Sequence, residues 1–277
     1  MMLSMGNIFS QSQFPSIEPS KLEYKTIDTV HLYLHIYRPK NFDKNKTYNA
    51  IVFFHGGGWN QGNYKAFKRQ SAYLASRGMI AISADYRVRR VHETTPFDAV
   101  EDAKSAIRYV RKNARELNIN PDMIAACGGS AGGHLAAVCG NIPGLEPKGE
   151  DLSVSSKPNA LVLFNPVYDN SQNGFGYKRM EGRYKEISPL HNIKKGAPPT
   201  IVFFGTKDKT TPVASSKEYE KKMKAAGSRI ELNLYEGAGH GFFNKSPFLE
   251  DTLYKADAFL TSLGYLKGKP SIKKPKI

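Results

Sequence analysis

Short apolar runs recur along the chain and predict the strands of one sheet. Residues 30–37 place an aliphatic side chain at every second position, which is typical of a strand with one buried face, and residues 22–27 suit an antiparallel partner at a sheet edge. The later runs are almost wholly apolar, as in strands that are buried on both faces of a parallel sheet. They cover residues 51–54, 79–84, 123–127, 160–164 and 200–204, and a more alternating run covers residues 230–235.

Amphipathic helical patterns lie between these runs. From residue 98 to residue 117, apolar side chains return every three or four positions, with Lys and Arg on the other faces. The alternation of strand and helix predicts the α/β class, with a mainly parallel sheet of eight strands flanked by helices. Further helices are expected over residues 65–77, 132–139, 214–226 and 249–263.

The same pattern predicts a single domain over residues 21–266, after a flexible N-terminus or signal remnant over 1–20 and before a basic tail over 267–277. Residues 140–159 and 165–199 do not fit the alternation of strand and helix. A long irregular connection in a compact domain is usually functional, so we expect residues 165–199 to form a small cap-like insertion over the strand ends. The N-terminus lacks a basic start, which leaves a periplasmic or secreted compartment and a cytoplasmic one both open.

The chain of 277 residues has 40 Lys and Arg against 25 Asp and Glu, a formal net charge of +15. Such an excess attracts polyanions, but no nucleic-acid motif accompanies it, and the lysines do not alternate with aromatic residues as a stacking platform requires. We therefore expect a solvated basic surface and no nucleic-acid partner, and an acidic polysaccharide is the first polyanion to test. No apolar stretch approaches the ~20 residues of a membrane span. Cys127 and Cys139 lie in apolar runs, as small buried thiols do.

A glycine-rich pentapeptide joins the strand expected at 123–127 to the helix expected at 132–139. It reads Gly128-Gly129-Ser130-Ala131-Gly132, which is the G-x-S-x-G pattern in a strand–turn–helix setting. The turn is so tight that a side chain at 128 or 132 would collide with its neighbours, and Ser130 would be held on a strained elbow as a nucleophile. The alternative is a plain strand–helix turn whose serine caps the helix.

A serine nucleophile needs a base and an acid that orients the base. Asp208 follows the strand expected at 200–204, and His240 follows the strand expected at 230–235 among glycines. The order Ser, Asp, His is that of the α/β-hydrolases. Taken singly, Asp208 suits a turn and His240 an exposed loop, but their shared order, strand position and glycine context favour a catalytic triad with Ser130.

These motifs resemble those of the α/β-hydrolase esterases related to hormone-sensitive lipase. The chain is most similar to the small bacterial acetyl-esterase-like members with His-Gly-Gly-Gly-Trp, here residues 55–59, and Gly-Gly-Ser-Ala-Gly-Gly, here 128–133, over about residues 21–265. Gly129 stands where the lipase-related enzymes commonly have Asp, and their extended N-terminal cap helices are absent from the pattern. The departures favour the compact polysaccharide-deacetylating or feruloyl-releasing relatives.

The resemblance implies an oxyanion hole made by the backbone N–H groups of Gly57, Gly58 and Ala131. It implies a serine carboxylic ester hydrolase that cleaves short acyl groups through an acyl-enzyme. The expected substrates are acetyl esters on a carbohydrate such as xylan or oligosaccharides. The expected partner is a small-molecule or carbohydrate ester. We expect neither a metal nor a cofactor, and a monomer and a homodimer are both open.

Other candidates rest on position alone. Substrate contacts are expected from Trp59, Tyr168, Tyr177, Arg179 and Phe242, although Trp59 would serve equally as a core residue. Two histidines that flank the motifs are expected to brace loops rather than to ionise in catalysis, namely His55 and His134.

Three other functions stay open on the sequence. The first is a feruloyl esterase or a lipase, and the second is an amide hydrolase, either a peptidase or an arylformamidase-like enzyme, whose relatives also carry His-Gly-Gly-x-Trp. The third is a binding protein that keeps the hydrolase fold without catalysis. Such a protein normally lacks a nucleophile, base or acid, and none is missing here.

Overall fold

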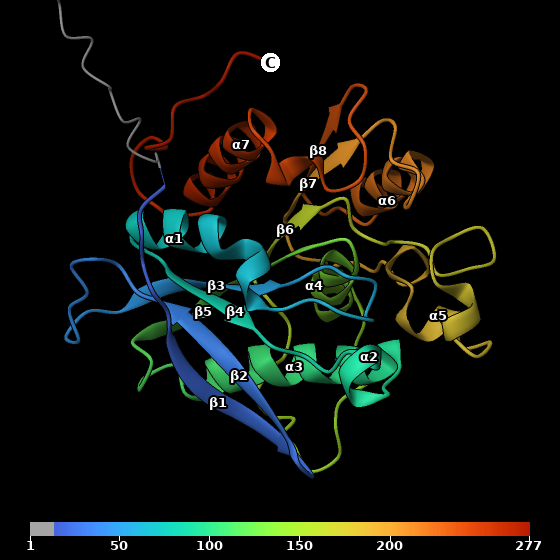
Figure 1. Ribbon diagram of the computed structural model, residues 1–277, viewed down its shortest axis with the longest axis horizontal. Helices are drawn as coiled ribbons and strands as arrows, with labels where there is room; N and C mark the ends of the chain where they lie inside the picture. Colours follow the sequence, from blue (N-terminus) through green and yellow to red (C-terminus); the bar gives the residue numbers. More distant parts are fainter. Residues whose placement is uncertain (1–13) are drawn as a thin grey trace, which may run out of the picture.

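The computed structural model describes residues 14–277, and its sheet confirms the predicted fold class (Figure 1). The expected N-terminus or signal remnant over 1–20 lies outside the described residues for its first thirteen positions. Within the described part, eight strands form one sheet in the order β1-β2-β4-β3-β5-β6-β7-β8. Their bounds are Ser20–Ile27, Val30–Tyr37, Tyr48–Phe54, Ile80–Ala84, Ile119–Gly129, Ala160–Phe164, Thr200–Gly205 and Ile230–Tyr235, numbered β1 to β8.

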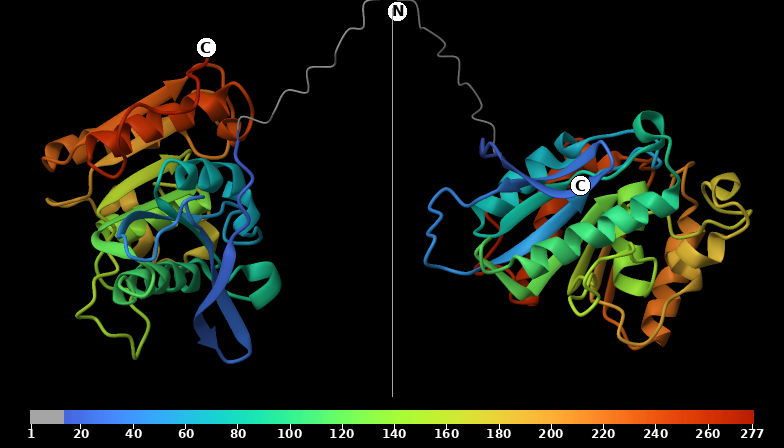
Figure 2. Two further views of the ribbon diagram at one scale, coloured as in Figure 1. Left: turned by 90° about the vertical axis from the view of Figure 1, so that its left-hand side faces the viewer. Right: turned by 90° about the horizontal axis from the view of Figure 1, so that it is seen from below.

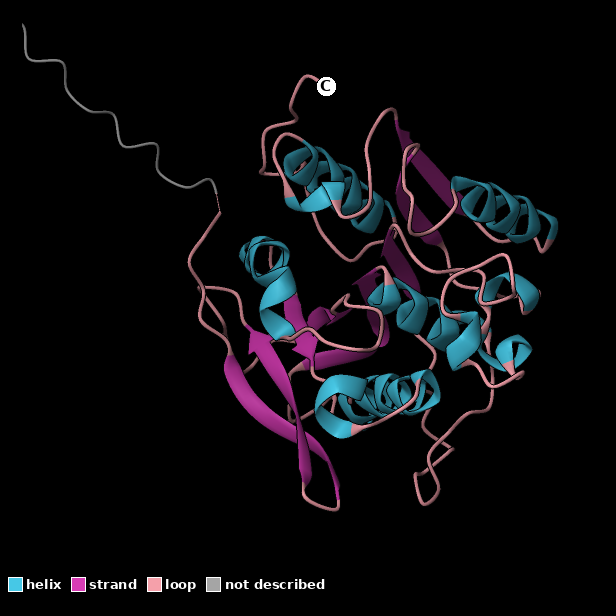
Figure 3. Ribbon diagram, turned by 45° about the vertical axis from the view of Figure 1, so that its right-hand side comes forward, coloured by secondary structure: helices cyan, strands magenta, loops and turns pink. Residues whose placement is uncertain are grey.

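The strand directions follow from the hydrophobic patterns. β1 and β2 pair antiparallel and form the expected edge hairpin, which Figure 3 shows along one side of the sheet. β2 also pairs antiparallel with β4, whereas every pair from β4 to β8 is parallel. The apolar strands β4, β6 and β7 are buried along their whole length, because helices cover both faces of this part of the sheet.

Two sets of helices cover the sheet (Figures 1 and 2). On one face lie α3, α4 and α6, and on the other lie α1 and α7, so each face has its own apolar core. The long helices are α1 Lys68–Ser76, α3 Pro96–Lys112, α4 Ala131–Asn141, α6 Val213–Ala225 and α7 Phe248–Ser262. Short helices and turns are η1 Tyr64–Phe67, α2 Arg89–His92, η2 Tyr177–Arg179, α5 Tyr184–Ile187, η3 Pro189–His191 and η4 Phe242–Asn244.

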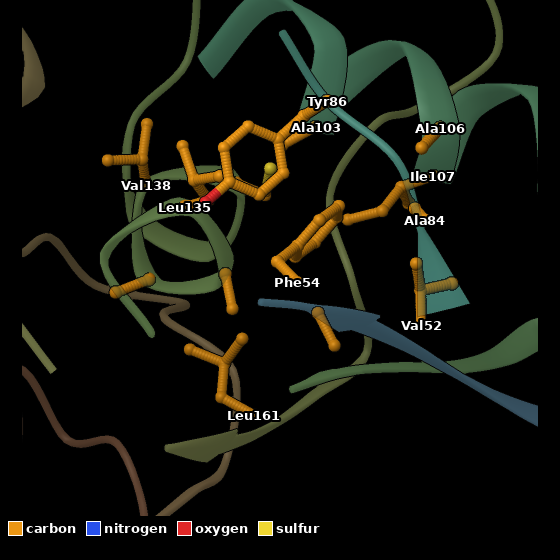
Figure 4. Close-up of a cluster of buried hydrophobic side chains, with 14 of the residues drawn as sticks. Val52, Phe54, Ala84, Tyr86, Ala103, Ala106, Ile107, Leu135, Val138 and Leu161 are labelled. Atoms are coloured by element: carbon orange, nitrogen blue, oxygen red, sulfur yellow. The ribbon is translucent and has the colours of Figure 1, made fainter. Parts of the chain in front are cut away.

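The core beneath the candidate site joins β3 to α3 and α4. Figure 4 shows Phe54 among side chains of both helices, including Ala103 and Leu135, all of them fully buried. Tyr86 lies in the same cluster, and its hydroxyl donates to the His55 carbonyl at 2.8 Å. A buried hydroxyl needs such a partner, so this contact ties the loop after β3 to the core.

The insertion over residues 165–199 packs against the domain through its last turn. η3 contacts both α4 and α6, and the Leu190 N–H donates to the Tyr168 carbonyl at 2.9 Å. η3 therefore holds this segment against α4 and α6. No helix among residues 14–277 is long and apolar enough to cross a membrane.

The basic segment at the end of the chain packs against the domain. Ile272 is buried in the core of the α1–α7 face, and its N–H donates to the Tyr73 hydroxyl at 3.3 Å. Arg77 donates to the Lys267 carbonyl at 2.9 Å and pairs with buried Asp257 at 2.7 Å. One apolar side chain among lysines is a weak sequence signal, and here it anchors the segment.

Candidate active site

Ser130 occupies a strained turn between β5 and α4. Its backbone angles are φ 54° and ψ −120°, which a non-glycine residue adopts only where the surroundings enforce it. A Cβ on Gly128 would lie 2.2 Å from the carbonyl of Gly132, and one on Gly132 would lie 2.0 Å from the carbonyl oxygen of Phe54. This close approach is the predicted one. The Ser130 side chain makes no capping hydrogen bond to α4, so the alternative of a capping serine is not what the structure shows.

Asp208 and His240 lie together at the ends of β7 and β8. The carboxylate accepts from His240 Nδ1 at 2.7 Å, and it also accepts from the N–H groups of Thr210 and Thr211 at 2.8 and 3.0 Å. The Thr211 hydroxyl donates at 3.0 Å to Asp208 Oδ2, the same oxygen that lies against His240 Nδ1. The Asp208 side chain has no exposed surface, whereas the His240 side chain is 27 % exposed.

The Asp208 carboxylate decides which ring nitrogen of His240 carries a proton. Burial alone would raise the pKa of Asp208, but the hydrogen bonds from His240 and Thr211 outweigh it and hold that pKa below its usual value. Asp208 is therefore a carboxylate at neutral pH and can only accept hydrogen bonds. In the neutral imidazole of His240 the proton therefore lies on Nδ1, and Nε2 keeps a lone pair for a proton transfer.

One pocket of about 810 Å³ contains both Ser130 and His240. A second hollow of about 770 Å³ lies at the amino ends of β6 and β7, and none of the three expected triad residues lines it. The pocket of Ser130 is lined by Gly56, Gly57, Gly58, Asn60, Gln61, Gly62, Ala66, Phe67, Arg89, Gly129, Ser130, Asn165, Phe175, Arg179, Thr210, His240, Gly241, Phe243 and Asn244.

The glycine run after β3 bends into this pocket. Gly57 and Gly58 have φ of 112° and 62°, and a Cβ on Gly57 would lie 1.9 Å from the carbonyl oxygen of Gln61. Within residues 14–277 the N–H groups of Gly57 and Gly58 donate to no other group of the protein. The same holds there for the N–H of Ala131, which opens α4 directly after Ser130. Unpaired N–H groups beside a serine can stabilise negative charge on a bound oxygen.

The expected substrate contacts divide into one that lines the pocket and four that do not. Arg179 lines it, and its guanidinium donates to the Gly58 carbonyl. Trp59 is only 1 % exposed, and its ring lies 4.9 Å from the ring of His134. It is therefore a core residue, which is one of the two roles that the sequence left open. Tyr168 is also buried, because its ring stacks on Tyr219 at 3.7 Å.

The other two residues expected to contact substrate, Phe242 and Tyr177, do not line this pocket either. Phe242 packs inward on Tyr235 at 4.8 Å, since η4 turns its neighbour Phe243 toward the pocket instead. Tyr177 stacks edge-on against Tyr184 at 5.9 Å within the insertion. An aromatic next to a motif can face either way in a turn, and the sequence pattern carries no period there to decide it.

Asn165 is a site residue that sequence reasoning missed. It is the first residue after β6, is 1 % exposed and has φ 32°. Its Oδ1 accepts from the Gly241 N–H at 3.0 Å, and its Nδ2 lies 3.4 Å from His240 Nε2. The only sequence signal is its place at the carboxyl end of an expected parallel strand, where ligand-binding residues gather.

The two flanking histidines brace loops. His55 Nδ1 lies 2.7 Å from the Gly56 carbonyl oxygen, at the start of the glycine run. His134 lies fully buried in α4, and its Nε2 donates to the Ile187 carbonyl at 2.8 Å, which joins α4 to the insertion. Burial lowers the pKa of His134 to about 4, so this imidazole is neutral at neutral pH.

Two family models match the chain in sequence. The BD-FAE model matches residues 34–162, and the dienelactone hydrolase family model matches residues 160–268. An AB hydrolase superfamily protein of Schizosaccharomyces pombe is 32 % identical over 78 % of this chain and 69 % of its own length. Esterase LipC of Mycobacterium tuberculosis is 30 % identical over 76 % of this chain, and an acetylxylan esterase of Xylanibacter ruminicola is 28 % identical over 72 %.

The curated relatives are longer than this chain. The match spans 56 % of LipC and 42 % of the acetylxylan esterase, so the chain corresponds to about half of each. A solved structure instead matches this chain over nearly all of its own length. Esterase 2 of Thermogutta terrifontis with bound propionate is 44 % identical, with a TM-score of 0.87 over 91 % of this chain and 97 % of that one.

Proposed function

Since the chain belongs to the α/β-hydrolase superfamily and is related to its esterases, we propose that it is a serine carboxylic ester hydrolase for short acyl groups. Acetyl esters of carbohydrates are the substrate class that we put first. One observation carries the proposal: Ser130 on its strained elbow, a His240 paired with Asp208, and the unpaired N–H groups of Gly57 and Gly58 share one pocket.

The geometry suits a two-step acyl transfer. Ser130 Oγ attacks the ester carbonyl, while His240 Nε2 takes the hydroxyl proton and then gives it to the leaving alcohol. Asp208 stabilises the imidazolium that forms between these events. A water activated by His240 then hydrolyses the acyl-enzyme, which releases the acid and restores Ser130.

Charge develops on the former carbonyl oxygen in each step. In the proposed mechanism the N–H groups of Gly57, Gly58 and Ala131 donate to this oxyanion. Loss of one such donor typically costs about 3 kcal/mol of transition-state stabilisation. Because the strained turns after β3 and β5 fix these groups before substrate arrives, they need no rearrangement during the reaction.

Support for a short acyl group comes from the pocket wall and the relatives. Phe67 and Phe243 stack at 5.9 Å beside Gly129 and line the pocket next to Ser130, which narrows the space for an acyl chain. The Thermogutta esterase has been solved with propionate and with butyrate. The carbohydrate class rests on the relative that is named an acetylxylan esterase.

A series of p-nitrophenyl esters tests the activity and the acyl length. We expect kcat/KM to be highest for the acetate to butyrate esters and at least tenfold lower for the decanoate, because a longer chain meets the aromatic wall. Ser130→Ala should lower kcat by more than about a thousandfold with unchanged circular dichroism. Ser228→Ala, at the amino end of β8, is the matched control and should keep wild-type rates.

A panel of natural ester classes then tests the substrate. Acetylated xylan and acetylated oligosaccharides should release acetate faster than methyl ferulate releases ferulate or formylkynurenine releases formate. Preference for methyl ferulate would favour a feruloyl esterase, and preference for formylkynurenine would favour the amide hydrolase. Equal rates for all p-nitrophenyl chain lengths would contradict the short-acyl assignment.

A further inference from the structure

Among residues 14–277, the pocket that contains Ser130 and His240 is lined by two arginines and by no acidic side chain. Arg89 enters it from the start of α2, and Arg179 enters it from η2 in the insertion. Two separate segments thus bring positive charge to the place where the ester must bind.

Neither guanidinium is neutralised by the protein. Among residues 14–277, no carboxylate lies within ion-pair distance of Arg89 or Arg179, and residues 1–13 contain no Asp or Glu. By contrast, Arg77, Arg87 and Arg108 each pair with a carboxylate. The pocket therefore carries two positive charges without a compensating anion.

Arg179 is held in place rather than free in solvent. One Nη donates to the Gly58 carbonyl, and the guanidinium carbon lies 5.4 Å from the ring centres of both Trp59 and Phe175. Burial and the neighbouring charge of Arg89 lower the pKa of Arg179. A partly desolvated cation of this kind costs free energy that a bound anion offsets.

We propose that the ester bound in this pocket carries a carboxylate besides its scissile group, and that Arg179 and Arg89 bind that carboxylate. The inference rests on the proposed ester hydrolase function and adds a specificity to it. A guanidinium suits this role because its planar N–H groups match the two oxygens of a carboxylate. The carboxylate takes no part in the chemistry and only orients the ester toward Ser130.

Matched pairs of esters test the inference on the purified chain. 4-Acetoxybenzoate is compared with its neutral amide, 4-acetoxybenzamide, and monomethyl succinate with methyl succinamate, so that the charge lies once on the alcohol side and once on the acyl side. Each kcat/KM is divided by the rate of hydroxide-catalysed hydrolysis of the same ester. We expect the anionic member of one pair to be preferred by roughly tenfold at low salt, and less at 0.5 M salt, since salt screens the attraction.

Variants assign the preference to the pocket. Arg89→Gln should lower the anion-to-neutral ratio by roughly fivefold or more, and Arg89→Lys should restore most of it because the charge returns. Arg115→Gln removes the same charge from an exposed site after α3 and should keep the wild-type ratio. Arg179→Lys should lower the ratio as well, together with the rate on both esters, since it also disturbs the contact with Gly58.

The outcomes separate this inference from the function on which it rests. If p-nitrophenyl acetate is cleaved but neither pair shows a preference for the anion, the inference is wrong and the esterase function stands. If Arg89→Gln and Arg115→Gln change the ratio equally, the preference comes from overall charge and the pocket assignment is wrong. If no ester is cleaved, both are wrong.

Discussion

At the scale of single residues, Asn165 links the loop of the candidate base to the end of β6. Its buried amide accepts from Gly241 and reaches toward His240 Nε2, although its backbone has the unfavourable φ of 32°. Strain of this kind persists where neighbouring contacts enforce it, and such positions cluster at functional sites. We regard Asn165 as a positioning residue that keeps the His240 loop in register with Asp208.

Asn165→Ala should lower kcat on p-nitrophenyl acetate by about tenfold or more, with a smaller change in KM, because a small displacement of the base slows proton transfer. Steady-state kinetics and circular dichroism measure the two effects. Asn173→Ala, at an exposed position of the same insertion, is the control and should keep wild-type kinetics. An unchanged kcat in Asn165→Ala would show that Asp208 alone positions His240.

Residues differ in how much of their role the sequence reveals. Ser130 stands among glycines that only a tight turn requires, so its elbow was predictable and the structure confirms the crowding at Gly128 and Gly132. Asn165 is one polar residue after an apolar strand, with no motif around it. Tyr168 lies in an irregular segment, where an aromatic residue stacks in the core, as it does here on Tyr219, as readily as it faces a pocket.

At the scale of elements, α4 and the insertion are joined through one buried histidine. His134 is neutral when folded, with a pKa of about 4, and takes up a proton near its ordinary value of 6.5 when unfolded. Between these values the unfolded state binds more protons, so stability is full above pH 6.5 and falls as the pH falls toward 4.

From pH 7 to pH 4.5 this group should remove roughly 2–3 kcal/mol from the free energy of unfolding. His134→Gln should be less stable than wild type at pH 7, because it loses the contact with Trp59, but should lack this part of the acid sensitivity. Urea unfolding at both pH values gives the difference. If His134→Gln loses as much stability between the two pH values as wild type does, the acid sensitivity belongs to other groups.

Elements were predictable where burial is complete and less so at their ends. The apolar run 123–127 marks only the middle of β5, which begins at Ile119 because Tyr48 pairs with that residue. The helix expected at 98–117 begins at Pro96, since Thr95 and Asp98 form a capping box, and it ends at Lys112. Apolar periodicity continues past that point in Ala114 and Leu117, which are buried in a turn.

At the scale of the whole molecule, the C-terminal segment closes the α1–α7 face. Deletion of residues 269–277 should lower the free energy of unfolding by about 2 kcal/mol, the value of one buried Ile side chain, because Ile272 leaves the core. Thermal unfolding measures the loss. Deletion of 275–277 keeps Ile272 and should keep wild-type stability, and equal stability of the two deletions would show that the segment adds nothing.

The set of residues that lines the pocket could not be predicted from the sequence pattern. Arg89, Phe175 and Phe243 follow β4, β6 and β8, which are far apart in the chain, and each lines the pocket because these parallel strands end at the same edge of the sheet. The triad order and the glycine run indicated the chemistry, since each is a local motif. The charge of the pocket depends on which side chains meet there, and no local motif encodes that.

The contacts of the insertion have a consequence for how this enzyme class diversifies. Residues 165–199 are one contiguous block, which a recombination event could exchange between relatives in a single step. Yet Arg179 of this block holds the Gly58 carbonyl, and Ile187 receives the hydrogen bond of His134. A transplanted block without these two residues would change the pocket wall. It would also remove the contacts that hold the loop of Gly58 and the helix α4 in place. We therefore expect successful exchanges to preserve both contacts.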